Sequence, residues 1–200
     1  MGSWTHGGVG TFEMTIAYNY ARHFPFDLDH YQNVVDQLSA LFNVPQPQLR
    51  LGTLPGQTAK SLAERQDFFT EGYYDSKDSY IGIDPGTDDD FQEWAVLHEF
   101  AHHIHHIERH GWVGFGHGSA FYERLERVVR AYGYDLADVA DKIAFETAYS
   151  WGALVKHLGH TLPNSFQFIF PVNRDILAEN ASMIREMLCE RDSTLSPKQA

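Results

Sequence analysis

The sequence predicts an α+β fold in which a small antiparallel or mixed sheet, containing a hairpin, packs on one central helix beside several further helices. Hydrophobic residues make up 43% and aromatic residues 14% of the 200 residues, which is typical of a packed globular protein. Two β-rich runs flank a short polar turn, and apolar residues recur at helical spacing on both sides of those runs. The length suits one domain, 1–200. We divide it into an N-terminal helical segment at 12–48, a core at 49–132 and a C-terminal helical extension at 133–200.

The first clear element is a helix over residues 28–43. Its apolar residues recur every three or four positions: Leu28, Tyr31, Val34, Val35, Leu38, Leu41 and Phe42. Asp27 or Asp29 is the expected N-cap, because a short acidic side chain accepts hydrogen bonds from the first free amides. Pro45 cannot continue a helix, and the segment therefore ends before it.

Three strands are expected next. Residues 49–53 form the first of them. The runs 71–75 and 79–84 are rich in Tyr and Ile and are separated only by Ser76-Lys77-Asp78. Two such runs around a short polar turn predict a β-hairpin.

A long helix is predicted over residues 90–108. On a projection of about 100° per residue, apolar side chains cover one broad arc and histidines cover the opposite arc. The apolar arc consists of Trp94, Val96, Leu97, Phe100, Ala101, Ile104 and Ile107, and the opposite arc of His98, His102, His105 and His106. The segment is therefore an amphipathic helix whose second face carries imidazoles.

The remaining elements are mostly helical. We expect helices at 119–132, 136–158 and 174–190, a short strand at 165–170 and a frayed tail at 192–200. Ser119, Asp135 and Asn173 stand where these helices begin, and short polar side chains are favoured there.

The long helix contains the motif H-E-x-x-H at residues 98–102. Residues four apart lie one turn apart on the same face of a helix, so His98 and His102 can present two imidazoles to one metal ion. Glu99 is rotated by about 100° around the helix, which is close enough to hold a water molecule beside that ion. A metal-dependent hydrolase needs this arrangement, and zinc is the expected metal.

A catalytic zinc site requires a third protein ligand and one open position. His105 and His106 lie about 10–12 Å along the helix axis from His98, too far to bind the same ion. His117 is the favoured candidate, because four glycines between residues 111 and 118 allow the chain to fold back toward the helix. The alternatives are Glu123, Glu126 and His110.

The hairpin, the H-E-x-x-H helix, the glycine-bearing loop and the following His117-Gly118-Ser119-Ala120-Phe121 resemble the SprT-like zincin metallopeptidases, in which H-E-x-x-H is followed by H-G-x-x-F. Small metallopeptidases of phages and bacteria have a similar layout. The resemblance covers residues 49–132 and implies a zincin-like catalytic core with a protein or peptide substrate. By this resemblance, His98, His102 and His117 are expected to be the zinc ligands and Glu99 the general base. No cysteine-rich zinc ribbon follows, and the DNA-linked roles of SprT-type proteins are therefore not implied.

The implied reaction is hydrolysis of a peptide bond by a zinc-activated water, with Glu99 taking the proton and passing it to the leaving amine. The strand Tyr80–Asp84 is expected to be the sheet edge above the site and to pair with an extended substrate. The oxyanion could be stabilised by Tyr122, Tyr149 or His110. The further histidines are expected to be a solvated helix end, a network that orients the ligands, or an adventitious metal patch: His103, His105, His106 and His110.

Composition excludes several classes of function. The net charge of −12 argues against a general nucleic-acid surface, so no nucleic-acid partner is expected. Cys189 is the only cysteine, which excludes an internal disulfide and a cysteine-ligated zinc site. The sequence shows neither a signal-peptide pattern nor a run of about 18 apolar residues. We therefore expect a cytoplasmic protein without a membrane partner, or a virion-associated one if a phage encodes it.

Two other functions fit the same motif. The first is a non-catalytic, zinc-stabilised structural or interaction protein on a zincin fold, although a base beside the metal has no use in such a site. The second is a zinc hydrolase that acts on a non-peptide amide. The motif predicts neither the substrate's sequence nor the oligomeric state.

Overall fold

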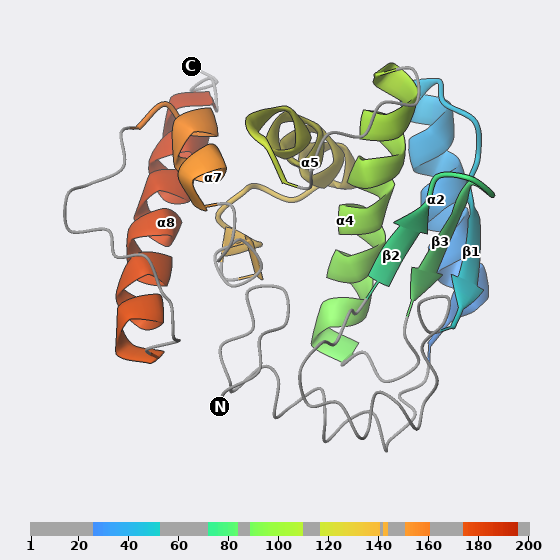
Figure 1. The fold of residues 1–200 in the computed structure, drawn as a ribbon, viewed down its shortest axis with the longest axis horizontal. Coiled ribbons are helices and arrows are strands. Elements are labelled where there is room, and N and C mark those ends of the chain that lie inside the picture. Colours follow the sequence, from blue (N-terminus) through green and yellow to red (C-terminus); the bar gives the residue numbers. More distant parts are fainter. Residues whose placement is uncertain are drawn as a thin grey trace.

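In the computed structural model, the described residues are 26–52, 72–83, 89–109, 117–140, 142–143, 151–160 and 174–195. They form five helices and a three-stranded mixed sheet, which confirms the predicted mixture of helix and sheet. Helix α4 stands between the sheet on one side and helix α5 on the other, and helices α7 and α8 lie beyond α5 (Figure 1). One cluster of buried apolar side chains extends from α2 to α8.

Helix α2 spans Leu28–Phe42 and begins at the predicted cap. The Asp27 carboxylate accepts a hydrogen bond of 2.9 Å from the amide of His30. The helix ends at Asn43, which adopts the left-handed conformation with φ 53°, as the short polar side chain of Asn allows. Its buried residues are Val34, Val35, Leu38 and Ser39. Leu41 is 64% exposed, so the buried face is narrower than the apolar spacing predicts.

The sheet consists of β1 (Gln48–Leu51), β2 (Gly72–Asp75) and β3 (Tyr80–Ile83). Strands β2 and β3 form the predicted antiparallel hairpin. The Asp75 carboxylate closes its turn by accepting hydrogen bonds from the amides of Lys77 and Asp78, at 2.9 and 3.2 Å. Strand β1 pairs with β3 in parallel, so the order across the sheet is β1-β3-β2.

This order corrects one prediction about the sheet. The strand Tyr80–Ile83 is central, not the edge that the expected role of Tyr80–Asp84 requires. Among the described strands, the edges are β1 and β2. The reason is the parallel pairing of β3 with β1, a contact between distant segments that local alternation of residues cannot show.

Helix α4 spans Asp89–Glu108 and is the centre of the core. Packed against it are β2, β3, α2 and α5. Its predicted apolar arc is largely buried: Trp94, Val96, Leu97, Phe100, Ala101 and Ile104 are at most 1% exposed. In the described part of the chain, no helix is both long and apolar enough to cross a membrane.

Helix α5 spans Ser119–Tyr132, as predicted. It ends at Gly133, whose φ of 107° is a left-handed conformation that glycine adopts without strain. The predicted helix over 136–158 is wrong at its start, because residues 136–139 form turns. In the described part of the remaining stretch, residues 140, 142 and 143 are helical and α7 spans Trp151–His157.

Helix α8 spans Arg174–Leu195 and continues past its predicted end at 190. The predicted tail over 192–200 is wrong at its start, since Asp192 is helical and only 8% exposed, and residues 196–200 lie outside the described residues. The Asp192 carboxylate accepts hydrogen bonds of 2.6 Å from Arg130 and from the amide of Ala137. These long-range contacts explain why the last helix continues. The predicted strand at 165–170 and the expected cap Asn173 lie outside the described residues.

Candidate metal centre

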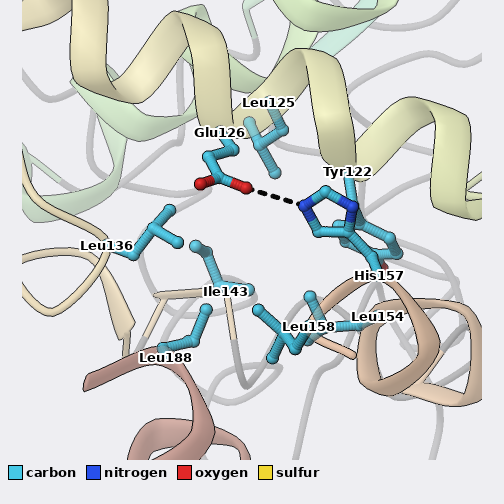
Figure 2. A pocket seen from close by; sticks show the side chains of 9 residues that line it. All are labelled: Tyr122, Leu125, Glu126, Leu136, Ile143, Leu154, His157, Leu158 and Leu188. Atoms are coloured by element: carbon cyan, nitrogen blue, oxygen red, sulfur yellow. Dashed lines mark hydrogen bonds and ion pairs between the residues drawn. The ribbon is translucent and has the colours of Figure 1, made fainter. Parts of the chain in front are cut away.

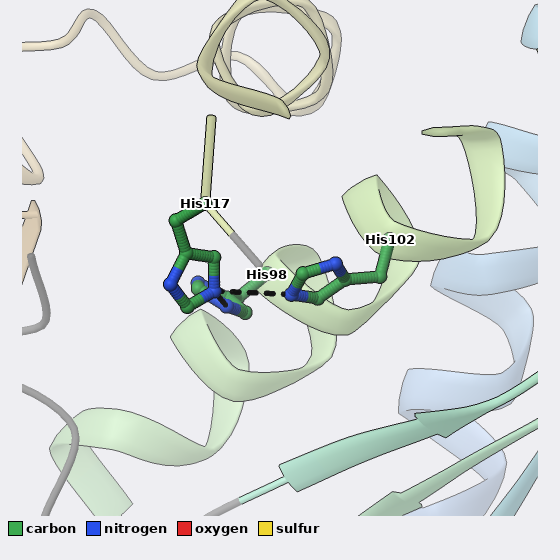
Figure 3. Close-up of side chains that lie close together, drawn as sticks. All are labelled: His98, His102 and His117. Carbon is green, nitrogen blue, oxygen red and sulfur yellow. Dashed lines mark hydrogen bonds between the residues drawn. The ribbon is translucent and has the colours of Figure 1, made fainter. Parts of the chain in front are cut away.

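Three imidazoles converge between α4 and α5. His98 and His102 project from α4, and His117 stands two residues before α5 (Figure 3). The Nε2 atom of His117 lies 3.0 Å from Nε2 of His98 and 3.1 Å from Nε2 of His102. One nitrogen from each ring lies within 4.8 Å of the others, so the group could hold a metal ion. The predicted helical pair and the predicted third ligand are therefore brought together.

The donor set fits a single cation. A neutral imidazole presents one nitrogen lone pair, and imidazole nitrogen is a common zinc ligand. A cation between the rings could therefore be bound by one nitrogen of each histidine. Ligands at 2.0–2.1 Å around a tetrahedral zinc lie about 3.3 Å apart. The observed separations of 3.0 and 3.1 Å are close to that value.

Helix α5 positions His117 relative to α4. Gly118 is the N-cap, and its carbonyl accepts the amides of Phe121 and Tyr122 at 2.9 and 3.2 Å. The two helices are also joined by Glu108 of α4, which accepts hydrogen bonds from Arg124 and Arg127 of α5 at 2.9 and 2.8 Å. These contacts fix the start of α5, and with it His117, beside the histidines of α4.

Phe121 contacts all three histidine rings. Its ring stacks on His102 with a centroid distance of 4.2 Å, and its centroid lies 4.6 Å from that of His117 and 5.0 Å from that of His98. Phe121 itself is fully buried. It thus forms an apolar floor that restricts the rings to orientations in which their Nε2 atoms meet. In the sequence Phe121 is only part of a motif. Its contact with the three histidine rings depends on the tertiary structure and could not be predicted.

Replacing Phe121 tests whether its ring orients the three histidines for metal binding. We expect Phe121→Leu to weaken zinc affinity about 10-fold, because the branched side chain keeps apolar volume but loses the flat face against His102. Its free energy of unfolding should fall by less than about 1.5 kcal/mol. Competition with a chromophoric chelator measures the affinity. Val129→Ala, at a buried position of the same helix, is the control that should lower stability without changing zinc affinity.

The alternative third ligands do not join this group. Glu123 is exposed and pairs with Arg124 at 2.9 Å. Glu126 is buried and pairs with His157, Arg130 and Arg191 at distances of 2.8 to 3.2 Å. His110, the remaining alternative, lies outside the described residues.

Glu126 is instead the centre of an ion-pair network between α5, α7 and α8. Figure 2 shows it with His157 at the wall of a small cavity that is otherwise lined by Tyr122 and apolar residues. Burial opposes the ionisation of Glu126. Hydrogen bonds from His157 and Arg191, with the charge of Arg191, outweigh burial and lower the pKa of Glu126 to about 2. The network therefore has a structural role that ties the C-terminal helices to α5.

The lowered pKa of Glu126 predicts that this residue contributes to folding stability and that the contribution is lost in acid. The unfolded chain ionises Glu126 near pH 4.5 and the folded chain near pH 2, so the contribution is complete above pH 4.5 and disappears as the pH falls from 4.5 to 2. We expect Glu126→Gln to remove on the order of 2 kcal/mol of unfolding free energy at pH 6. Its difference from the wild type should shrink below pH 4. Urea unfolding at several pH values measures this, and Glu123→Gln, at an exposed position of the same helix, should show no such trend.

Glu99 lies on α4 directly after His98 and is only 8% exposed. Strand β2 covers it: a Cβ atom at Gly72 would lie 2.9 Å from Cγ and 3.4 Å from Oε1 of Glu99. The predicted general base is thus held in the space between the helix and an edge strand. Gly72 is not among the residues that the sequence singles out.

Two of the extra histidines of α4 are buried, whereas a solvated helix end would leave them exposed. His103 is fully buried and His105 is 3% exposed. Nε2 of His103 donates to the carbonyl of Pro45 at 2.7 Å, and Nδ1 lies 3.0 Å from the Tyr74 hydroxyl. Burial lowers the pKa of both histidines, which favours their neutral forms. His103 therefore connects α4 to two other parts of the chain.

One candidate for stabilising an oxyanion lies in the described part of the chain. Tyr122 is 2% exposed, and its ring centroid lies 6.4 Å from that of His117 and 6.5 Å from that of His157. Tyr122 also lines the small cavity of Figure 2. Tyr149 and His110 lie outside the described residues.

Comparisons with family models, with curated proteins and with solved structures find no match to this chain.

Proposed function

We propose that this protein is a zinc-dependent metallopeptidase. The observation that carries the proposal is the convergence of the Nε2 atoms of His98, His102 and His117, with a buried glutamate directly after the first of them. His102 and His117 are only partly buried, so the group is not sealed inside the core. Three protein ligands with room for a further one are typical of catalytic zinc sites, whereas structural sites have four protein ligands.

In the proposed reaction the three imidazoles hold the ion and Glu99 moves the proton. A bound zinc ion supplies Lewis acidity, which makes a water molecule more acidic and polarises a carbonyl. Glu99 accepts the proton of the attacking water and delivers it to the leaving amine. The covering strand limits the access of bulk water to the Glu99 stem, which keeps the carboxylate in one place for both transfers.

The position of β2 supports an extended peptide as the substrate. In the described part of the chain, β2 pairs with β3 along one side only, and it lies against α4 at Glu99 (Figure 1). An edge strand offers a row of backbone donors and acceptors to which an extended peptide can add as a further strand. We therefore assign to β2 the docking role that the sequence suggested for Tyr80–Asp84.

A cleavage assay tests the proposal. The protein is purified without metal-affinity resin, loaded with one equivalent of zinc, and incubated with an unfolded protein and with a peptide library read by mass spectrometry. We expect new peptide termini that disappear with a chelator and return when zinc is added back. Zinc binding without any cleavage would favour the structural or interaction protein. Release of amines from non-peptide amides alone would favour the other hydrolase.

A further inference from the structure

Strand β2 and helix α4 meet through two matched pairs of residues. Gly72 and Tyr74 are two apart on β2 and thus share one face of the strand. On α4 the partners are Glu99 and His103, which are four apart and share one face of the helix. A Cβ atom at Gly72 would lie 2.9 Å from Cγ of Glu99, and the Tyr74 hydroxyl lies 3.0 Å from Nδ1 of His103.

The two spacings agree. Two residues of a strand advance about 6.6 Å, and four residues of an α-helix advance about 6 Å. The strand therefore runs along the helix in one register, with both contacts made at once. A shift of β2 by one residue would direct Tyr73, with its large ring, toward Glu99. The contact between Tyr74 and His103 opposes that shift.

The requirement for glycine at position 72 comes from the contact and not from the backbone. Gly72 is not among the glycines with positive φ, so its conformation is open to any residue. The same Cβ atom would lie 3.2 Å from Cδ1 of Ile83, so it could not move away from Glu99 freely. A methyl group at this position would have to displace the Glu99 side chain, which is the flexible partner.

We propose that Gly72 is a positioning residue: by lacking a side chain, it sets the place of the Glu99 carboxylate between β2 and α4. The catalytic consequence of this inference rests on the proposed function, because the inference gives β2 a role in proton transfer as well as in substrate docking. The contact itself does not depend on that function.

The first test is Gly72→Ala in the zinc-loaded full chain. We expect kcat for peptide cleavage to fall about 10- to 100-fold, because a shift of about 1 Å misplaces the base. Zinc affinity and KM should change little. Gly52→Ala is the matched control, since a Cβ atom there would have nothing within 4 Å. Equal loss of activity in both variants, or a loss of zinc affinity in Gly72→Ala, would overturn the proposal.

The second test asks whether shortening the general base removes the effect of Gly72→Ala. Glu99→Asp removes one methylene group from the side chain on which the new methyl group of Gly72→Ala would press. We expect the double variant Gly72→Ala/Glu99→Asp to be no slower than Glu99→Asp alone. If Gly72→Ala slowed the Glu99→Asp variant as much as it slows the wild type, the contact with Glu99 would not be the cause of the loss.

A third test needs no activity. Thermal unfolding is compared for the wild type, Gly72→Ala, Glu99→Ala and the double variant. We expect Gly72→Ala to lower the melting temperature in the wild type but much less in the Glu99→Ala background, where the side chain in contact has been removed. Additive shifts would overturn the proposal whatever the cleavage assay shows. Coupled shifts in a protein that cleaves nothing would support the positioning contact and contradict only the peptidase function.

Discussion

Replacing Glu99 by Gln is expected to slow peptide cleavage by about 100- to 10,000-fold while zinc stays bound. Gln has nearly the same shape as Glu and should fit under β2, where Glu99 is 8% exposed. It cannot accept the proton of the attacking water, however. The loss should therefore lie in kcat, with KM changed little. Steady-state cleavage of a fluorogenic peptide and zinc affinity by competition measure the two properties separately.

The control for this prediction is Glu93→Gln. Glu93 is on the same helix and accepts hydrogen bonds of 2.6 Å from the hydroxyl groups of Tyr132 and Tyr134, which are not part of the histidine group. Its replacement should reduce stability and leave kcat within about two-fold of the wild type. A Glu99→Gln protein that still cleaved peptides at the full rate would contradict the assignment of the base.

Replacing His117 by Ala is expected to remove most of the zinc binding. The variant loses one of three converging nitrogens, and we expect its affinity to fall at least about 100-fold, more than the loss of an outer hydrogen-bond partner usually causes. At a zinc concentration 100 times the wild-type Kd, zinc should stabilise the wild type by about 2.7 kcal/mol and the variant by about 0.4 kcal/mol. Unfolding with and without zinc measures this difference.

His106→Ala is the matched control for that experiment. His106 belongs to the same stretch of α4 but is not part of the histidine group, and its ring lies 5.8 Å from that of Tyr74. Zinc should stabilise this variant as much as the wild type. Equal loss of zinc binding in His106→Ala and His117→Ala would mean that the metal is held elsewhere among the histidines.

The parts of the fold that depend on local patterns could be predicted from the sequence. Asp27 caps α2 as expected, because a cap depends on neighbouring residues. Helix α5 begins at Ser119 as predicted. The pairing of His98 and His102 follows from the helical repeat alone. His117 could be selected because the glycines around it permit a return of the chain, and the structure brings its Nε2 to that pair.

The parts that depend on long-range contacts could not be predicted. The parallel pairing of β1 with β3 makes β2 the edge strand beside α4, and no local pattern shows this pairing. The closeness of Gly72 to Glu99 follows from that arrangement. Glu126 was a candidate ligand by its position in the sequence, but it binds His157 of α7 and Arg191 of α8 instead. Asp192 is buried for a similar reason, since it accepts the amide of Ala137, 55 residues earlier.

The most direct test of the proposed centre is a crystal structure of the full chain with one equivalent of zinc, measured on both sides of the zinc absorption edge. We predict one anomalous peak, about 2.0–2.1 Å from Nε2 of His98, His102 and His117, with a position open to solvent on the side of Glu99. No peak between these rings, or a fourth protein ligand closing the site, would contradict a hydrolytic zinc centre.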